Sequence, residues 1–214
     1  MDIELATAAF VTLFVIIDPI GLAPLFVTLT VGMTTRQRLS VALRALATGA
    51  GILAVFGIAG EFVLNKIGIG MPAFRISGGI LLFLIAIEML FEKRTPRREK
   101  TAEDNAEDDA RPDPAVFPLA MPLIAGPGAM TTIILLMGQN SGVVSNQITI
   151  YLVMLAVLVI VFLLFMASGM MERVLGHTGI NLITRLMGMF LAALSVQFVL
   201  DGLREYGFLA TQSG

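Results

Sequence analysis

The chain contains no cysteine, no tryptophan and only one histidine, His177, among its 214 residues. The absence of cysteine excludes disulfide bonds, thiolate metal sites and cysteine nucleophiles. A lone histidine offers no imidazole pair for a metal, and no glycine-rich loop ending in Gly-Lys is present to bind a nucleotide. We therefore expect no metal, no cofactor and no nucleic-acid partner, and we expect that the protein is not an enzyme.

Long hydrophobic runs dominate the sequence instead. Hydrophobic residues make up 57% of the chain and charged residues only 14%, and the mean hydropathy is +0.89. A helix of about 20 apolar residues crosses a bilayer. The sequence therefore predicts an all-α membrane protein with six transmembrane helices, at residues 5–30, 41–64, 69–91, 116–138, 148–171 and 182–200.

The basic residues are concentrated in alternate connections between these spans. Only Lys66, Arg75 and Arg204 lie on one side, whereas the other side holds eleven. Cytoplasmic loops are enriched in Lys and Arg, so we predict that the eleven are cytoplasmic and that both termini lie outside, in the periplasm. The eleven are Arg36, Arg38, Arg44, Lys93, Arg94, Arg97, Arg98, Lys100, Arg111, Arg173 and Arg185.

One charged segment, residues 92–115, separates two groups of three spans. Its first part is basic, its second part is acidic, and it has almost no apolar residues to bury. We expect a solvated cytoplasmic linker, the basic part of which can contact anionic lipid. The predicted units are therefore residues 1–91, the linker 92–115, and residues 116–214.

The two units carry similar motifs at nearly constant spacing. Asp18-Pro19 corresponds to Gly126-Pro127 at an offset of 108, and Arg75-Ile76-Ser77-Gly78 corresponds to Arg185-Leu186-Met187-Gly188 at an offset of 110. Because three spans is an odd number, the second unit must enter the membrane from the opposite side, as an inverted-topology repeat. Proline interrupts a helix, so we predict that the first and fourth helices are discontinuous near the midplane.

Each interruption would create the N-terminus of a half-helix. Asp18 and Gly126 are the predicted N-caps, and Pro19 and Pro127 are the predicted first helical residues. Free amides and the positive end of the helix dipole favour anions at such a terminus. Because Gly126 has no side chain, we predict that the amides after it bind the carboxylate of a small zwitterionic substrate.

Asp18 is the ionisable residue predicted nearest to the middle of a span, and such residues are candidates for function. It would receive the substrate ammonium or carry a proton or sodium; alternatively, it only caps its half-helix. Glu88 is a second ion-coupling candidate, or it snorkels to the interface, and Gln197 lines the site or bonds between helices. The predicted substrate-binding residues are Asp18, Pro19, Gly21, Gly126, Pro127, Gly128, Ala129, Met130, Thr131, Thr132 and Gln197.

Two strings around the breaks are distinctive. They are Phe14-x-x-x-Asp18-Pro19-Ile20-Gly21-x-x-Pro24-Leu25-Phe26 and Pro122-Leu123-Ile124-Ala125-Gly126-Pro127-Gly128-Ala129. With the six spans and the charged central loop, they resemble the MarC family of integral membrane proteins. The first motif of that family has Asn or Asp before the proline. The resemblance implies a prokaryotic inner-membrane protein that transports small neutral amino acids such as glycine and alanine.

The residues and the resemblance together predict a secondary active transporter, a symporter of small neutral amino acids coupled to a proton or sodium gradient. The predicted site is rich in Gly, Ala and Thr and has no Trp, Tyr or His, which suits a small substrate. Two alternatives stay open: an exporter of drugs or small metabolites, and a passive channel. Membrane lipid is the expected surrounding, and the Gly-rich helix faces allow a homo-oligomer.

Overall fold

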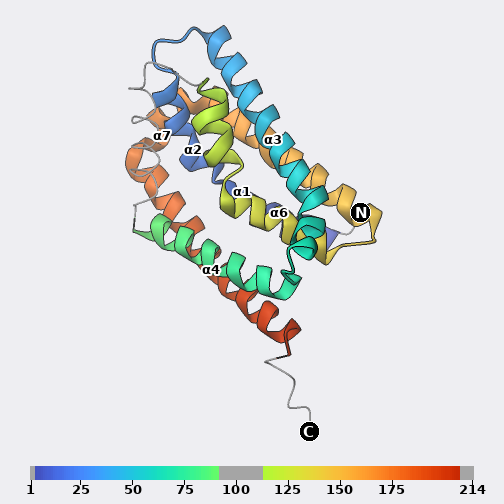
Figure 1. The fold of residues 1–214 in the computed structure, drawn as a ribbon. Helices are drawn as coiled ribbons and strands as arrows, with labels where there is room; N and C mark the ends of the chain where they lie inside the picture. Colours follow the sequence, from blue (N-terminus) through green and yellow to red (C-terminus); the bar gives the residue numbers. More distant parts are fainter. Residues whose placement is uncertain (1–2, 92–112, 208–214) are drawn as a thin grey trace.

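The computed structural model describes residues 3–91 and 113–207, and within these ranges every regular element is a helix (Figure 1). The predicted linker residues 92–112 therefore lie outside the described residues. The elements are α1 (Ile3–Ile17), α2 (Pro19–Leu29), α3 (Thr35–Lys66), α4 (Met71–Leu90), η1 (Ala115–Ile124), α6 (Pro127–Gln139) and α7 (Val144–Glu205).

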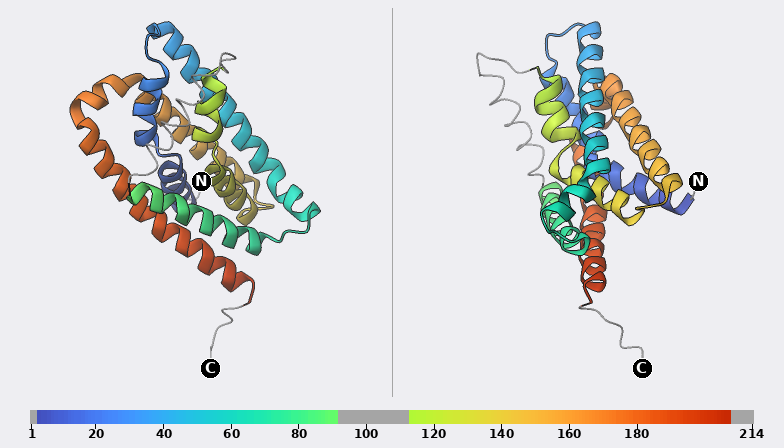
Figure 2. Two further views of the ribbon diagram at one scale, coloured as in Figure 1. Left: turned by 60° about the vertical axis from the view of Figure 1, so that its left-hand side comes forward. Right: turned by 45° about the vertical axis from the view of Figure 1, so that its right-hand side comes forward.

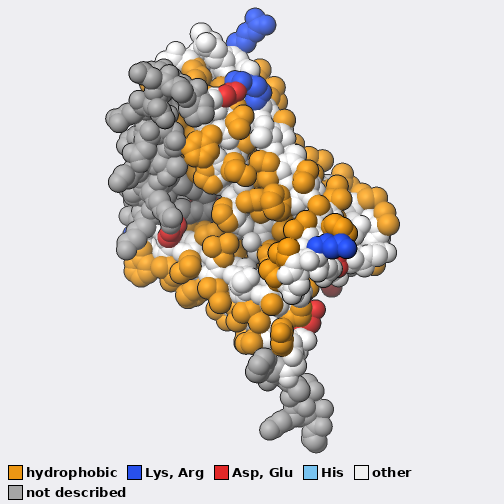
Figure 3. Space-filling view, in the orientation of Figure 1, with side chains coloured by type: hydrophobic (Ala, Val, Ile, Leu, Met, Phe, Trp, Pro, Cys, Tyr) orange, Lys and Arg blue, Asp and Glu red, His pale blue; other side chains and the backbone are white. Residues whose placement is uncertain are grey.

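These helices are long and apolar enough to cross a membrane. Five segments satisfy this condition alone, and η1 with α6 makes a sixth if the bent pair is counted as one span. Large apolar side chains such as Phe62, Val159 and Phe190 are exposed, and apolar side chains are spread over the described part of the face shown in Figure 3. Water would disfavour such a surface, but lipid matches it. The all-helical class agrees with the sequence prediction.

Helices α1 and α2 follow one another across a single residue, Asp18. The Asp18 amide donates to the Phe14 carbonyl at 3.0 Å, and the Leu22 amide donates to the Asp18 carbonyl at 3.0 Å. Backbone hydrogen bonding therefore continues on both sides of the interruption. For this reason Ile3–Leu29 is long enough to serve as one span.

Helix α3 begins earlier than the sequence prediction placed it. We expected Arg36 and Arg38 in a connection, which is wrong: both lie near the start of α3, behind the N-cap Thr34. The Gln37 amide donates to the Thr34 hydroxyl at 3.3 Å, and the Thr34 amide donates to the Gln37 side-chain oxygen at 2.8 Å. This reciprocal capping box starts the helix six residues before the apolar run at Val41.

The fourth predicted span is irregular in its first half. The Ala125 amide bonds to the Ala120 carbonyl five residues earlier, at 2.8 Å, and Phe117 and Met121 have extended backbones within η1. Both residues precede a proline, whose ring disfavours the helical conformation of the residue before it. Between η1 and α6 the chain bends by 56°.

Helix α7 contains the last two candidate spans, Val144–Met170 and Thr178–Glu205, which we call its first and second halves. Gly176 separates them with φ of 60° and ψ of 175°, a conformation that glycine adopts without steric cost. Figure 1 shows the chain changing direction at this point. Helix α2 packs against both halves, with Ala23 clustered with Ile180 and Leu164.

Helix α4 and the second half of α7 lie side by side and antiparallel (Figure 2). A β-carbon on Gly79 would lie 2.8 Å from the Ser195 carbonyl, and one on Gly188 would lie 2.9 Å from the Met89 β-carbon. Such contacts require glycine and bring the two backbones close together. Near one end of this pair, Arg75 and Glu205 form an ion pair at 2.9 Å.

The two groups of helices pack against each other throughout. Helix α3 contacts η1 and α6, whereas α1, α2 and α4 all contact α7. The α2–α3 connection, the C-terminal end of α4 and the bend of α7 lie toward one end of the molecule (Figure 1). We call it the basic end, because Arg36 and Arg38 lie there at the start of α3.

Candidate functional site

The first break is held by the side chain of Asp18. This residue is 3% exposed and has φ of 57° and ψ of 64°, a left-handed conformation that Asp adopts more readily than most residues. Its Oδ1 accepts a hydrogen bond from the Gly21 amide at 3.1 Å, which caps α2 in the way the sequence predicts. The positive end of α2 also favours the carboxylate at this position.

Gly21 is the residue that makes room for this carboxylate. A β-carbon at position 21 would lie 2.8 Å from Asp18 Cγ and 3.0 Å from Asp18 Oδ1. Contacts of that length are not compatible with an undisturbed side chain. The glycine is therefore needed for its lack of a side chain, while Pro19, buried at the first helical position, starts α2.

The second break lies at the N-terminus of α6. Gly126 is the N-cap and has no side chain with which to bond the amides of the first turn, and Pro127 follows at the first helical position. Gly128 and Ala129, whose amides belong to this turn, are buried. Amides at a helix start have no partner within the helix, so this terminus is suited to a carboxylate.

The two breaks lie next to each other. A β-carbon on Gly128 would lie 3.3 Å from Ile16 Cγ2 at the end of α1, two residues before Asp18, and 3.2 Å from Leu82 Cδ2 and 2.9 Å from Ile85 Cδ1 of α4. One side of the first turn of α6 thus packs against α1 and α4, whereas Pro127 in the same turn is exposed. The first turn of α6 and the last turn of α1, far apart in sequence, are therefore in contact, and Asp18 lies two residues beyond that contact in the chain.

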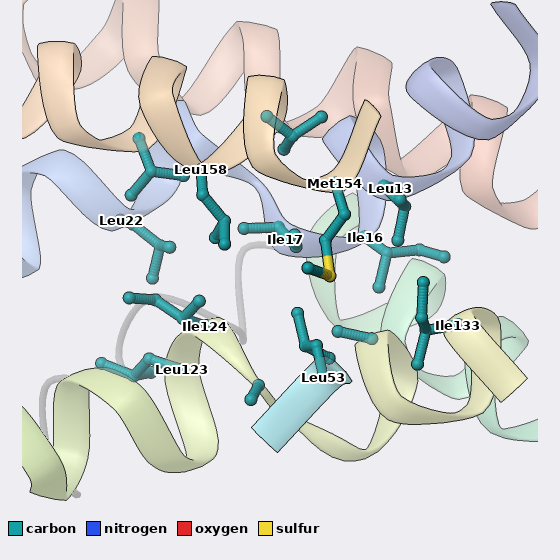
Figure 4. Close-up of a cluster of buried hydrophobic side chains, with 14 of the residues drawn as sticks. Leu13, Ile16, Ile17, Leu22, Leu53, Leu123, Ile124, Ile133, Met154 and Leu158 are labelled. Atoms are coloured by element: carbon teal, nitrogen blue, oxygen red, sulfur yellow. The ribbon is translucent and has the colours of Figure 1, made fainter. Parts of the chain in front are cut away.

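Apolar side chains fill the space around the breaks. Figure 4 shows Ile16 and Ile17 of α1 in one buried cluster with Ile124 of η1 and Ile133 of α6, and each of the four is at most 3% exposed. A polar substrate can reach the amides of α6 only if some of these side chains move.

The predicted threonines differ in their surroundings. Thr131 is 8% exposed, and its methyl group packs directly against Gly78 of α4. Thr132 is fully buried, and its hydroxyl is without a hydrogen-bond partner among the described residues. A buried hydroxyl without a partner is costly, so Thr132 is the polar group of α6 best prepared to bind a ligand.

The remaining predicted residues are less buried than this centre. Pro127 is exposed and Met130 is half-buried. Gln197 is exposed on the second half of α7, where its amide donates to Asp201 Oδ1 at 2.9 Å. Glu88 is half-buried near the C-terminal end of α4.

Sequence reasoning did not identify Ile16, Leu82 and Ile85 as neighbours of the α6 terminus. They are aliphatic residues within apolar runs, and nothing in their local sequence separates them from side chains that face lipid. Only the tertiary packing of α1 and α4 against Gly128 assigns them to the site.

Comparison with known proteins agrees with these features. The profile described as "MarC family integral membrane protein" matches residues 3–206. A UPF0056 membrane protein of Aquifex aeolicus is 38% identical over 92% of this chain and 91% of its own length. A second, from Methanocaldococcus jannaschii, is 34% identical over 95% of this chain and 98% of its own.

A third relative, the UPF0056 membrane protein YvbG of Bacillus subtilis, is 35% identical over 91% of this chain and 92% of its own length. No solved structure matches the chain. The family profile spans nearly the whole sequence, and the relatives align with it from end to end. The chain is therefore an integral membrane protein and belongs to the MarC family.

Proposed function

We propose that the protein is a secondary active transporter of small neutral amino acids such as glycine and alanine, driven by a proton or sodium gradient across a prokaryotic inner membrane. The substrate carboxylate binds the amides at the start of α6, and its ammonium group binds Asp18. The coupling ion binds at Asp18, with Glu88 as a second candidate.

One observation carries the proposal: the N-terminus of α6 lies against the last turn of α1, beside Asp18. The position of a β-carbon on Gly128 is 3.3 Å from Ile16 Cγ2, and Asp18 is buried two residues farther along the chain. Donors for a carboxylate and an acceptor for an ammonium group thus lie close together. Amino acids present these two charges on neighbouring atoms.

The packing around Gly128 supports a small substrate. Ile16, Leu82 and Ile85 all approach its α-carbon so closely that even a methyl group at that position would meet them within 3.3 Å. Modest side-chain movements would open room for glycine or alanine. A large aromatic side chain would require the helices themselves to separate, because packed interiors resist such insertions.

The antiparallel pairing of α4 with the second half of α7 supports an inverted-repeat architecture with discontinuous first and fourth spans. These two helices hold the corresponding motifs that begin at Arg75 and Arg185, and two inverted copies would place them side by side in opposite directions. In this architecture the basic end faces the cytoplasm and both termini face the periplasm.

Uptake into proteoliposomes tests the proposal. Radiolabelled glycine and alanine are supplied to purified protein under an imposed proton gradient, an imposed sodium gradient, or neither. We expect saturable accumulation with one of the gradients, competed by unlabelled small neutral amino acids and much less by tryptophan. Empty liposomes and the Asp18→Ala variant serve as controls.

Each alternative gives a different result. A flux that does not saturate and does not depend on either imposed gradient would indicate a passive channel. No accumulation of glycine or alanine by folded protein in liposomes of either orientation would refute the proposed substrates, and stimulated efflux of drugs would favour the exporter.

A further inference from the structure

Two buried aromatic rings join α2 to α7 at the basic end. Phe26 of α2 and Phe165 of the first half of α7 are 0% and 1% exposed. Their ring centroids are 4.3 Å apart with an interplanar angle of 4°, so the rings are stacked. Phe26 lies eight residues after Asp18, about 12 Å along the helix, on the side of the site that faces the basic end.

Arg38 of α3 contacts both helices that carry this aromatic pair. Its Cζ lies 5.4 Å from the centroid of the Phe26 ring, within the range of a cation–π interaction. Its Nη2 donates to the Ser168 hydroxyl at 3.3 Å, and this hydroxyl donates to the Phe165 carbonyl at 2.8 Å. One side chain therefore connects α2, α3 and α7.

The attachment of Arg38 is incomplete. Among residues 3–91 and 113–207, its buried Nε has no hydrogen-bond partner and no carboxylate pairs with it. An Arg that is held by a hydroxyl and an aromatic ring can be released more easily than one held by a buried ion pair, because no unpaired carboxylate is left behind. Such a contact is suited to repeated opening and closing.

The other end of the molecule is shaped differently. Between α1 and the second half of α7 runs a groove of about 500 Å³, lined by Ile3, Glu4, Thr7, Ala8, Val11, Thr12 and Leu194. It extends along α1 to within six residues of Asp18. A surface groove thus lies along α1 at this end, whereas the contacts of Phe26, Phe165 and Arg38 join the helices at the basic end.

We propose that Phe26, Phe165, Arg38 and Ser168 form a gate that closes the route from Asp18 to the basic end. The gate opens when α2 separates from the first half of α7, which unstacks the two rings and releases Arg38 from Ser168. This inference rests on the proposed transport function for its purpose, but the opening itself can be measured without any substrate.

Cysteine labelling measures the opening directly, since the natural chain has no cysteine. Leu22 is fully buried on α2, between Asp18 and Phe26, so Leu22→Cys reports on access to this region. The protein is placed in lipid nanodiscs, where both faces are open to a membrane-impermeant maleimide. We expect slow labelling of Leu22→Cys, and labelling about tenfold faster when Arg38→Ala is added, because the closed state then loses its fastening.

Arg36→Ala is the matched control. Arg36 is exposed two residues away on the same helix, so its removal changes the charge by the same amount and leaves the gate intact. Ser168→Ala, which removes only the hydroxyl oxygen, should also increase the labelling rate of Leu22→Cys, but by less than Arg38→Ala does. Equal labelling rates for the Arg36 and Arg38 variants, in protein that elutes as a single folded species, would overturn the gate.

A cross-link tests whether the gate must open. In the Phe26→Cys/Phe165→Cys double variant, a bifunctional methanethiosulfonate reagent that bridges the space of the two rings should join α2 to α7 and stop amino-acid uptake, and a thiol reductant should restore it. Uptake that continues after complete cross-linking would refute the gate. If wild-type protein transports neither glycine nor alanine while the labelling differences remain, the substrate assignment fails and the gate stands.

Discussion

Replacing Gly21 with alanine should stop transport because it displaces the side chain of Asp18. A β-carbon at position 21 would lie 2.8 Å from Asp18 Cγ and 3.0 Å from the Oδ1 atom that accepts the Gly21 amide proton. The Asp18 side chain must therefore leave its position. The carboxylate proposed to bind the ammonium group would then point elsewhere.

Three contributions determine the effect of this substitution on stability. Loss of an N-cap costs about 0.5–2 kcal/mol, whereas alanine inside a helix is favoured over glycine by about 1 kcal/mol. A carboxylate that is 3% exposed and loses its amide partner adds a further cost of about 1–3 kcal/mol, so we expect the free energy of unfolding to fall by about 0.5–4 kcal/mol. Glycine uptake into proteoliposomes should fall to the level of empty liposomes, and thermal unfolding in detergent reports the stability.

Gly51→Ala is the matched control for this substitution. Gly51 is exposed on α3, and a β-carbon there would meet nothing within 4 Å. This variant should gain about 1 kcal/mol of helix stability and transport normally. If Gly21→Ala transports as well as Gly51→Ala does, the position of the Asp18 carboxylate is irrelevant to transport, and Asp18 is a helix cap alone.

Three further substitutions test the site and its frame. Asp18→Asn keeps the cap, so its free energy of unfolding should lie within about 0.5 kcal/mol of that of the natural chain. This variant should nevertheless lose gradient-driven accumulation in liposomes. Normal accumulation would show that transport does not need the charge of Asp18. Gly128→Val should abolish glycine uptake because its β-carbon would meet Ile85 at 2.9 Å. As a control, Gly169→Val should transport normally, because a β-carbon at position 169 meets nothing within 4 Å. Equal uptake by the two variants would exclude the α6 terminus as the binding site. Gly79→Val should lower the free energy of unfolding by about 1–3 kcal/mol, measured by thermal unfolding, and an unchanged value would contradict the close α4–α7 packing.

Local features of the site could be predicted because their causes are local. The Asp18-Pro19 and Gly126-Pro127 pairs fix where α2 and α6 begin, through a proline at the first helical position and the presence or absence of a capping side chain. The apolar runs likewise mark the spans, since their length is set by bilayer thickness. These features require no knowledge of which helices are neighbours.

Other features depend on contacts that sequence patterns do not reveal. Arg38 reaches Ser168 across 130 residues of sequence, and in the sequence it looks like one more cytoplasmic charge in a connection. The extended residues of η1 follow from Pro118 and Pro122, but the apolar run around them reads as a regular helix. In both cases the sequence pattern, a basic connection or an apolar run, does not reveal the contact or the backbone conformation that the structure shows.

The cross-packing of the two groups of helices has a consequence for how the protein is assembled. Helix α3 finds its partners in η1 and α6, and α4 finds its main partner in α7, so each half exposes unsatisfied helix faces until the other half arrives. A gene cut within residues 92–112 should therefore yield two polypeptides that are each degraded when made alone. When both are made in the same cell, they should find one another in the bilayer and restore a working protein without a covalent connection.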